Sequence, residues 1–345
     1  MFFTIQKGFL SGLRLISFYA SLATFAILAS CGSDTDKKQT DSALSSEKMS
    51  IVVTTTHLND IVSRIVEDRF KVVPLMGPGV DPHLYRPTSR DALAISNADL
   101  IVFHGMMLEG KLAETLQNSR NKGIPSYNAT EKINPKKIIG HSKSSKSLNH
   151  PDPHVWFDPS IWSNVVQNLS DRISILDPEG TEIYKSNTEK ICAEIYLVSE
   201  WAKNRVNEIP ENKRKLITSH DAFQYFGRAM GLNVVALQGI STTAEAGLAD
   251  RVNLVNTIMK EKIPAIFIES SVNPNAINEI ARECKISIGG KLFSDALGSG
   301  KDFVIGPKSI SFPCNTWSGM MVHNINTIVD SLKLTIFRFH LKFTT

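Results

Sequence analysis

The chain has 345 residues, of which 42% are apolar and 21% charged, a composition typical of a folded protein and too apolar for a disordered one. Its length suggests two domains. The formal net charge of +4 argues against a strongly basic nucleic-acid binder, and four cysteines are too few for a disulfide scaffold of this size.

The first 30 residues are predicted to be a lipoprotein signal peptide. A positively charged start precedes an uncharged run over 15–30, which is shorter than the about 20 residues that a membrane-spanning helix needs. The run ends in LASC at Cys31, which resembles a bacterial lipobox and implies cleavage before Cys31 and lipidation of its sulfur. An ordinary signal peptide or an uncleaved anchor is the alternative. Residues 31–48 are polar and Ser-rich, and we expect a flexible tether there.

Short β-rich segments alternate with helical patterns along the rest of the chain, which predicts parallel sheets covered by helices. The predicted buried strands are 51–55, 71–75, 100–103, 215–218, 233–237 and 265–268. The helical patterns between them include 59–66 and 249–261.

One long segment breaks this alternation. Pro178 and Pro210 bracket a stretch with a single glycine, in which apolar residues recur at steps of three and four. We predict one rigid linking helix over 177–210, about 45 Å long if about 30 residues are helical; two helices with a hidden break are the alternative. The predicted fold is α/β, with an N-terminal lobe over 49–176 and a C-terminal lobe over 211–335, each with parallel sheets flanked by helices.

Four segments combine turn residues with metal-ligand chemistry. Asp-Pro-His steps end at His83, in a loop fixed by prolines and glycines, and at His154, before an aromatic cluster. His220 follows a predicted strand, where the loops of open α/β sheets line the ligand crevice, and Asp295 follows another short apolar run. Each histidine alone is more often structural. Together, three imidazoles and a carboxylate suit Zn²⁺ or Mn²⁺ better than Cu(I).

These segments resemble a known family. Together with 239–247 (GISTTAEAG) and 266–272 (IFIESSV), they are similar to the zinc/manganese family of ABC-transporter solute-binding lipoproteins, also called cluster 9 or the bacterial solute-binding protein 9 family. The similarity covers residues 50–335. It implies one divalent metal ion, Mn²⁺ or Zn²⁺, bound between two lobes as the transported ligand. The ligands that it implies are His83, His154, His220 and Asp295.

The resemblance also implies a role without catalysis. The protein would capture the ion and hand it to an ABC permease and its ATPase. We expect it outside the cytoplasm, on the periplasmic side or the outer surface, anchored to the membrane through the lipid on Cys31, and we expect a monomer that binds no nucleic acid. A histidine at the position of His220 occurs in zinc binders and in members that handle both ions, whereas 239–247 is similar to manganese-transporting members, so both ions stay open.

The sequence leaves two alternative functions. A zinc-dependent hydrolase is disfavoured because the sequence lacks an HExxH helix and because four protein ligands leave no position for a catalytic water. A surface adhesin with a structural metal depends only on the lipid anchor. It is compatible with transport.

Several further residues are expected to have roles other than metal coordination. We expect His57 and His104, at strand ends, in supporting or surface roles, and His141 and His150 in a solvated loop. For Glu245 and Glu269, the alternatives are a bridge between the lobes, the orientation of a ligand, and a plain ion pair. A Cys284–Cys314 disulfide is an option, and we expect Cys192 to be packed. The sequence also has an insert-like run over 300–318 and an atypical tail over 336–345.

Overall fold

A computed structural model describes residues 48–140 and 151–333. The predicted signal peptide, Cys31, nearly all of the predicted tether, the 141–150 loop with its two histidines, and the tail lie outside the described residues. We call 48–140 with 151–180 the N-terminal half and 207–333 the C-terminal half. The lobe boundaries predicted at 176 and 211 stay a prediction.

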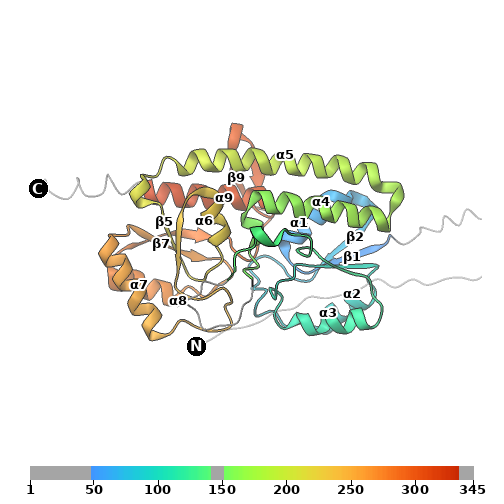
Figure 1. Ribbon diagram of the computed structural model, residues 1–345, viewed down its shortest axis with the longest axis horizontal. Coiled ribbons are helices and arrows are strands. Elements are labelled where there is room, and N and C mark those ends of the chain that lie inside the picture. Colours follow the sequence, from blue (N-terminus) through green and yellow to red (C-terminus); the bar gives the residue numbers. More distant parts are fainter. Residues whose placement is uncertain (1–47, 141–150, 334–345) are drawn as a thin grey trace, which may run out of the picture. The chain divides into compact units, whose positions relative to one another are not determined.

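A four-stranded parallel sheet forms the centre of the N-terminal half, in the order β2-β1-β3-β4. Figure 1 shows its strands β1 and β2 side by side. Its strands are β1 (Ser50–Val53), β2 (Lys71–Pro74), β3 (Leu100–Phe103) and β4 (Ser126–Asn128). Successive strand side chains point to opposite faces. Ile51 and Val53 therefore pack into the core with α1 (Thr56–Val66), whereas Val52 packs against α2 (Ser89–Ser96) and α3 (Leu112–Asn121).

The C-terminal half contains two parallel strand pairs and one antiparallel pair. The strands are β5 (Lys215–Thr218) with β6 (Asn233–Ala236), β7 (Ala265–Glu269) with β8 (Ser287–Leu292), and β9 (Phe303–Ile305) with β10 (Ser311–Pro313). Its helices are α6 (Gln224–Met230), α7 (Leu248–Glu261), α8 (Asn275–Cys284) and α9 (Trp317–Lys333). The insert-like run 300–318 thus contains the β9–β10 hairpin.

Two predicted buried strands are wrong in their burial. The segments at 71–75 and 233–237 form β2 and β6, but Lys71 and Asn233 are exposed and the other strand residues are at most partly buried. The reason is position: β2 is one of the two edge strands of its sheet, and β6 pairs with β5 alone among the described strands. An edge strand keeps one side open, which an apolar sequence run does not reveal.

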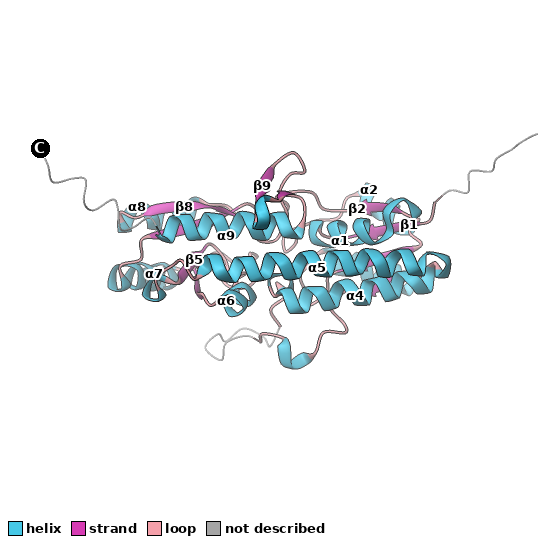
Figure 2. Cartoon of the chain, turned by 90° about the horizontal axis from the view of Figure 1, so that it is seen from above, coloured by secondary structure: helices cyan, strands magenta, loops and turns pink. Residues whose placement is uncertain are grey.

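The long helix is continuous, as predicted. It is α5 (Thr181–Val206, 26 residues), and it begins after the proline because Pro178–Gly180 forms a 3-10 turn. Its stripe from Tyr184 through Ile195 to Val206 is buried against α1, α4 (Pro159–Leu176) and α9 (Figure 2). The alternative of two broken helices is excluded, and the α/β class with helix-flanked parallel sheets is confirmed.

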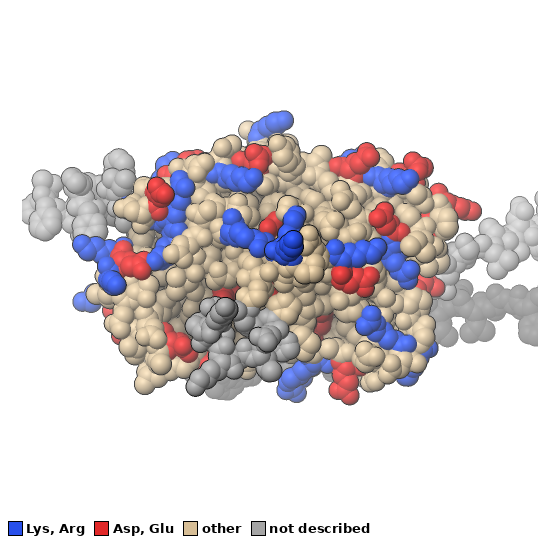
Figure 3. All heavy atoms as spheres, in the orientation of Figure 1, with Lys and Arg blue, Asp and Glu red and all other residues tan. Residues whose placement is uncertain are grey.

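Three further observations bear on the surface and the cysteines. Cys192, Cys284 and Cys314 are all free thiols, so the optional Cys284–Cys314 disulfide is not formed. On the face in Figure 3, basic and acidic side chains are interspersed. Within 48–140 and 151–333, no helix has both the length and the apolar character that crossing a bilayer requires.

Candidate metal site

His83 is held by a turn in the loop that follows β2. The Asp81 Oδ1 atom accepts a hydrogen bond from the His83 backbone N–H at 2.8 Å, which fixes an Asx-type turn. Gly110 makes close approach possible on the other side, because a Cβ there would lie 2.4 Å from the His83 carbonyl oxygen. Gly110 also has a φ of +42°, which favours glycine. The imidazole is consequently buried although its loop lies partly on the surface.

His154 lies directly before the 3-10 turn Val155–Phe157 that leads into α4. Asp152 Oδ1 accepts hydrogen bonds from the His154 backbone N–H at 2.9 Å and from its ring Nδ1 at 2.7 Å. Both side chains are fully buried. A carboxylate on one ring nitrogen fixes the tautomer and directs the other nitrogen, Nε2, towards a ligand.

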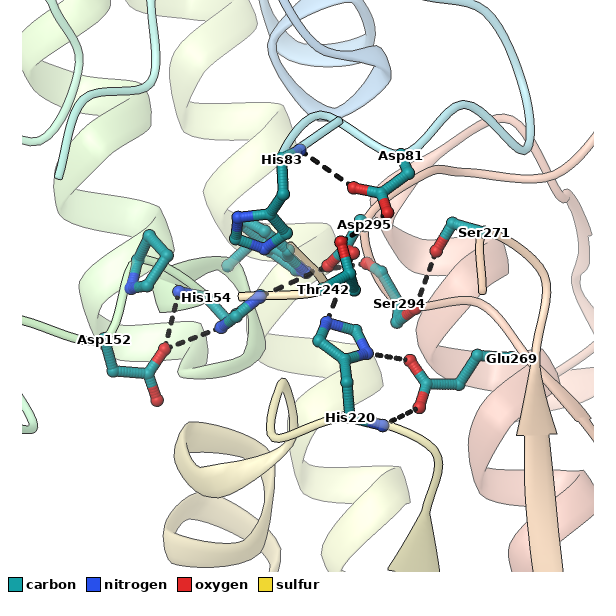
Figure 4. A network of polar contacts seen from close by, with 12 residues as sticks. Asp81, His83, Asp152, His154, His220, Thr242, Glu269, Ser271, Ser294 and Asp295 are labelled. Carbon is teal, nitrogen blue, oxygen red and sulfur yellow. Dashed lines mark hydrogen bonds and ion pairs between the residues drawn. The ribbon is translucent and has the colours of Figure 1, made fainter. Parts of the chain in front are cut away.

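His220 has a similar carboxylate partner that comes from a neighbouring strand. Strands β5 and β7 belong to different strand pairs but lie in contact, and the end of β5 lies near Glu269 at the end of β7. Glu269 Oε1 accepts a hydrogen bond from the His220 backbone N–H at 2.9 Å, and Oε2 lies 2.6 Å from the His220 Nδ1 atom (Figure 4). Both residues belong to the C-terminal half, so this contact does not bridge the two halves; it is an ion pair that also orients His220.

Asp295 brings the three histidines together. Its Oδ1 lies 3.3 Å from His154 Nε2, and its Oδ2 lies 3.2 Å from His220 Nε2. One ligand atom from each of the four predicted residues, His83 included, lies within 4.8 Å of the other three, and all four residues are buried. Separations near 3.2 Å are about what two atoms bound to one Zn²⁺ at 2.0–2.1 Å would have.

The orphaned polar atoms at this point fit a cation. Among the described residues, Nε2 of all three histidines and both carboxylate oxygens of Asp295 are buried and make no hydrogen bond, although Asp295 forms ion pairs with His154 and His220. Buried polar atoms without a hydrogen bond are costly unless something satisfies them. The donor set therefore fits one divalent ion, although whether these residues bind it stays a prediction.

The pKa values describe how protons occupy the metal-free site. Burial lowers the pKa of His83 to about 3. Burial acts in the same direction on His154, but Asp152 and Asp295 outweigh it and raise the pKa to about 9. Burial is likewise outweighed at His220, where Asp295 and Glu269 raise the pKa well above the usual range. Burial opposes ionisation of Asp295, but His220 and His154 hold its pKa well below the usual range. Two imidazolium groups thus flank one carboxylate at neutral pH.

His57 and His104 lie beside the cluster without joining it. His57 stacks on Trp156 with ring centroids 4.4 Å apart, and His104 Nε2 lies 2.7 Å from the Pro153 carbonyl oxygen. Both are fully buried, so the surface role considered for them is wrong and a supporting role remains. Burial lowers their pKa values to about 3 and about 4. Glu245 is exposed and is not part of the four-residue cluster.

Sequence reasoning overlooked the two aspartates of the Asp-Pro-His steps. Asp81 and Asp152 each accept the backbone N–H of the histidine two residues later. The signal was present in the spacing, because a carboxylate two residues before an N–H forms the same local turn in both places. Thr242, which contacts Asp81 from the C-terminal half, carried no such signal.

Comparison with known proteins agrees with this geometry. A family model described as zinc-uptake complex component A, periplasmic (ZnuA), matches residues 51–331. The chain is 35% identical over 318 residues to the manganese-binding lipoprotein MntA of Bacillus subtilis, a match that covers 90% of this chain and 96% of MntA. It is 29% identical over 320 residues to the manganese ABC transporter substrate-binding lipoprotein scaA of Streptococcus gordonii, covering 90% and 96%.

A solved structure is similar over the same region. The periplasmic zinc-binding protein TroA from Treponema pallidum has a TM-score of 0.75 and 34% sequence identity, and the match covers 83% of this chain and 99% of TroA. Both the sequence and the fold therefore lead to one family, whose members are binding receptors rather than enzymes. The chain belongs to the zinc and manganese ABC-transporter solute-binding protein family.

Proposed function

We propose that the protein binds one Mn²⁺ or Zn²⁺ ion as cargo through His83, His154, His220 and Asp295. The observation that carries this proposal is the buried convergence of four ligand atoms within 4.8 Å. Imidazole and carboxylate ligands suit these two ions. Four protein ligands fill a tetrahedral site, which fits capture rather than hydrolysis, because catalytic zinc keeps an open position for water.

The bound ion is handed to an ABC permease that its ATPase drives. The protein works outside the cytoplasm, anchored through a lipid on Cys31, with the ion held between an N-terminal lobe (49–176) and a C-terminal lobe (211–335). Supporting this, scaA is named a substrate-binding lipoprotein of a manganese ABC transporter and MntA a manganese-binding lipoprotein. His83 and His154 come from the N-terminal half and His220 and Asp295 from the C-terminal half.

The transported ion need not be the ion that binds more tightly. A given site with nitrogen and oxygen ligands binds Zn²⁺ more tightly than Mn²⁺, because affinity rises along the Irving–Williams series. Competition between Zn²⁺ and Mn²⁺ on the purified protein measures that preference. Uptake of each ion by cells with and without the protein identifies the cargo.

Metal analysis tests the proposal directly. Protein purified after expression of the full chain should bind one Zn²⁺ or Mn²⁺ per molecule, and a variant with both His83→Ala and His220→Ala should bind none tightly. His323→Ala is the matched control, because His323 bonds to the Lys291 carbonyl oxygen and lies outside the four-residue cluster. Absence of bound metal in the wild type, or unchanged binding in the double variant, would refute the assignment.

A further inference from the structure

Two loops from opposite halves meet beside the candidate metal site. Thr242, in the loop between β6 and α7, donates a hydrogen bond from its hydroxyl to Asp81 Oδ2 at 2.6 Å. The other oxygen of the same carboxylate accepts the His83 backbone N–H at 2.8 Å (Figure 4). A continuous chain of hydrogen bonds therefore runs from Thr242 through Asp81 to a candidate ligand. Asp81 and Thr242 are partly exposed, whereas His83 is buried.

The two N-terminal ligands differ in how their loops are attached to the C-terminal half. The segment around His154 makes several such bonds: the Tyr225 hydroxyl donates to the Asp152 carbonyl oxygen at 3.0 Å, Trp156 Nε1 donates to the Ser294 carbonyl oxygen at 3.2 Å, and Trp317 Nε1 donates to the Trp156 carbonyl oxygen. In the described part of the chain, the loop over 77–85 has one hydrogen bond to the C-terminal half, the bond from Thr242.

The loop that carries Thr242 is itself anchored on one side. Leu237 and Gln238 donate backbone N–H groups to Thr218 and Ser219, so the start of the loop follows the segment before His220. Within 240–246, the other hydrogen bonds join Ser241 to Thr243 and stay inside the loop. Among the described residues, the hydrogen bond from Thr242 to Asp81 is thus the one that joins residues 240–246 to another part of the chain, the 77–85 loop.

We propose that Thr242 is a positioning residue for His83: its hydrogen bond to Asp81 holds the 77–85 loop against the C-terminal half and slows release of the bound ion. The inference rests on the proposed metal-binding function. The His154 segment keeps its several bonds while the ion leaves, so separation of the 77–85 loop is the step that opens the site. Loss of one bond at this loop consequently changes the dissociation rate more than the association rate.

The test compares three single substitutions in the full chain. Thr242→Val keeps the shape of the side chain and removes the hydroxyl, and Thr242→Ser restores the hydroxyl. Thr243→Val is the matched control, because the Thr243 hydroxyl contacts only Ser241 among the described residues. Each protein is loaded with Zn²⁺ and mixed with an excess of a chromogenic zinc chelator, and the rate of zinc release is followed by stopped flow.

Thr242→Val should release Zn²⁺ about tenfold faster, the change expected when a hydrogen bond to a charged group is lost. Thr242→Ser and Thr243→Val should stay within about twofold of the wild type by the same reasoning. Hydrogen exchange in the metal-free protein should show faster exchange over 77–85 in Thr242→Val alone, which reports the loop independently of the metal.

The outcomes separate this inference from the proposed function. Wild-type protein that binds stoichiometric Zn²⁺, with equal release rates and equal exchange in Thr242→Val, overturns the role of Thr242 and leaves the metal site intact. Equal acceleration by Thr243→Val also overturns it, because the effect would then belong to the loop as a whole. Wild-type protein that binds neither Zn²⁺ nor Mn²⁺ overturns both the role of Thr242 and the proposed function.

Discussion

His83 and His220 face each other across the candidate metal site, with ring centroids 6.1 Å apart, and they are held in different ways. Glu269 contacts both the backbone N–H and the ring Nδ1 of His220. Asp81 contacts only the backbone N–H of His83, so no carboxylate orients that ring among the described residues. The two rings also differ in charge: Asp295 and Glu269 raise the pKa of His220 well above its usual range, so that ring is protonated, whereas burial lowers the pKa of His83 to about 3 and leaves that ring neutral.

This difference teaches that one site can combine a pre-organised part with an adjustable part. His154, His220 and Asp295 form a buried group joined by ion pairs, in which one further carboxylate holds each histidine. His83 adds a neutral ligand from a loop at the surface. The fixed group should therefore determine affinity, while His83 should govern entry and exit of the ion.

The largest expected effect on metal affinity comes from single substitutions of the ligands, which compare His220 in the fixed group with His83 in the surface loop. His220→Ala deletes a ligand and leaves the Glu269 carboxylate buried without its partner. Metal affinity should therefore fall by at least about 1000-fold. This loss exceeds the about 10- to 100-fold that is typical when a residue that only hydrogen-bonds a ligand is removed. His83→Ala leaves the charged group intact and should cost about 100-fold or less. Competition with a chelator of known affinity measures both. Equal losses of metal affinity in the two variants would show that His83 and His220 do not differ in their contribution to binding.

Neutralising the orienting carboxylates should have the next largest effect. Glu269→Gln and Asp152→Asn retain size but weaken the hold on His220 and His154, and each should lower metal affinity about 10- to 100-fold. Glu245→Gln removes an exposed carboxylate and serves as the control. Titration calorimetry with Mn²⁺ and Zn²⁺ gives the values. If Glu245→Gln lowered metal affinity as much as the other two variants do, the total charge of the protein, rather than the orientation of the histidines, would determine affinity.

Metal binding should release protons from His154 and His220 but not from His83. The pKa of His154 is raised to about 9 and that of His220 is also raised, so both carry protons at neutral pH that an incoming ion must displace. Affinity should therefore rise with pH from about 6.5 towards 9, with about two protons released per ion at pH 7. His83, whose pKa is about 3, contributes none.

Calorimetry in buffers of different ionisation enthalpy counts these protons. We expect the wild type and His83→Ala to release the same number, and His220→Ala to release about one fewer. The same number in all three proteins would contradict the assignment of charge to His220.

A smaller effect should follow from crowding the His83 loop. In Gly110→Ala the new Cβ would lie 2.4 Å from the His83 carbonyl oxygen, so the loop must shift and affinity should fall by about five- to tenfold, equivalent to about 1–1.4 kcal/mol. Gly123→Ala is the matched control, because it has a positive φ but nothing within 4 Å. It should lower the unfolding free energy without changing metal affinity. Chelator competition and urea unfolding distinguish the two outcomes.

The sequence patterns predicted those strands and helices whose local residue preferences agree with their place in the fold. Strand β3 occupies 100–103 as expected, because a short apolar run that is buried on both faces leaves few alternatives. Strand β8 was missed since it contains Gly289 and Gly290, residues depleted in strands. Gly289 is required there by tertiary contact: a Cβ would lie 2.6 Å from the Phe267 ring.

The same distinction applies to the site. His83 and His154 were identified because a rigid local turn marks each of them. Glu269 and Thr242 act on residues that are 49 and 161 positions away in the chain, respectively. No spacing rule connects such pairs, so only the fold can show that Glu269 orients one imidazole and that Thr242 contacts the turn of another.

The continuous core around α5 has a thermodynamic consequence. One hydrophobic cluster extends from Ile51 in β1 to Leu332 in α9 and includes the buried stripe of α5, so the halves share side chains that neither can bury alone. Unfolding of either half would expose this cluster. We therefore expect one cooperative melting transition. Because a ligand that binds only the folded state stabilises that state by mass action, a single bound ion should raise the melting temperature of both halves together.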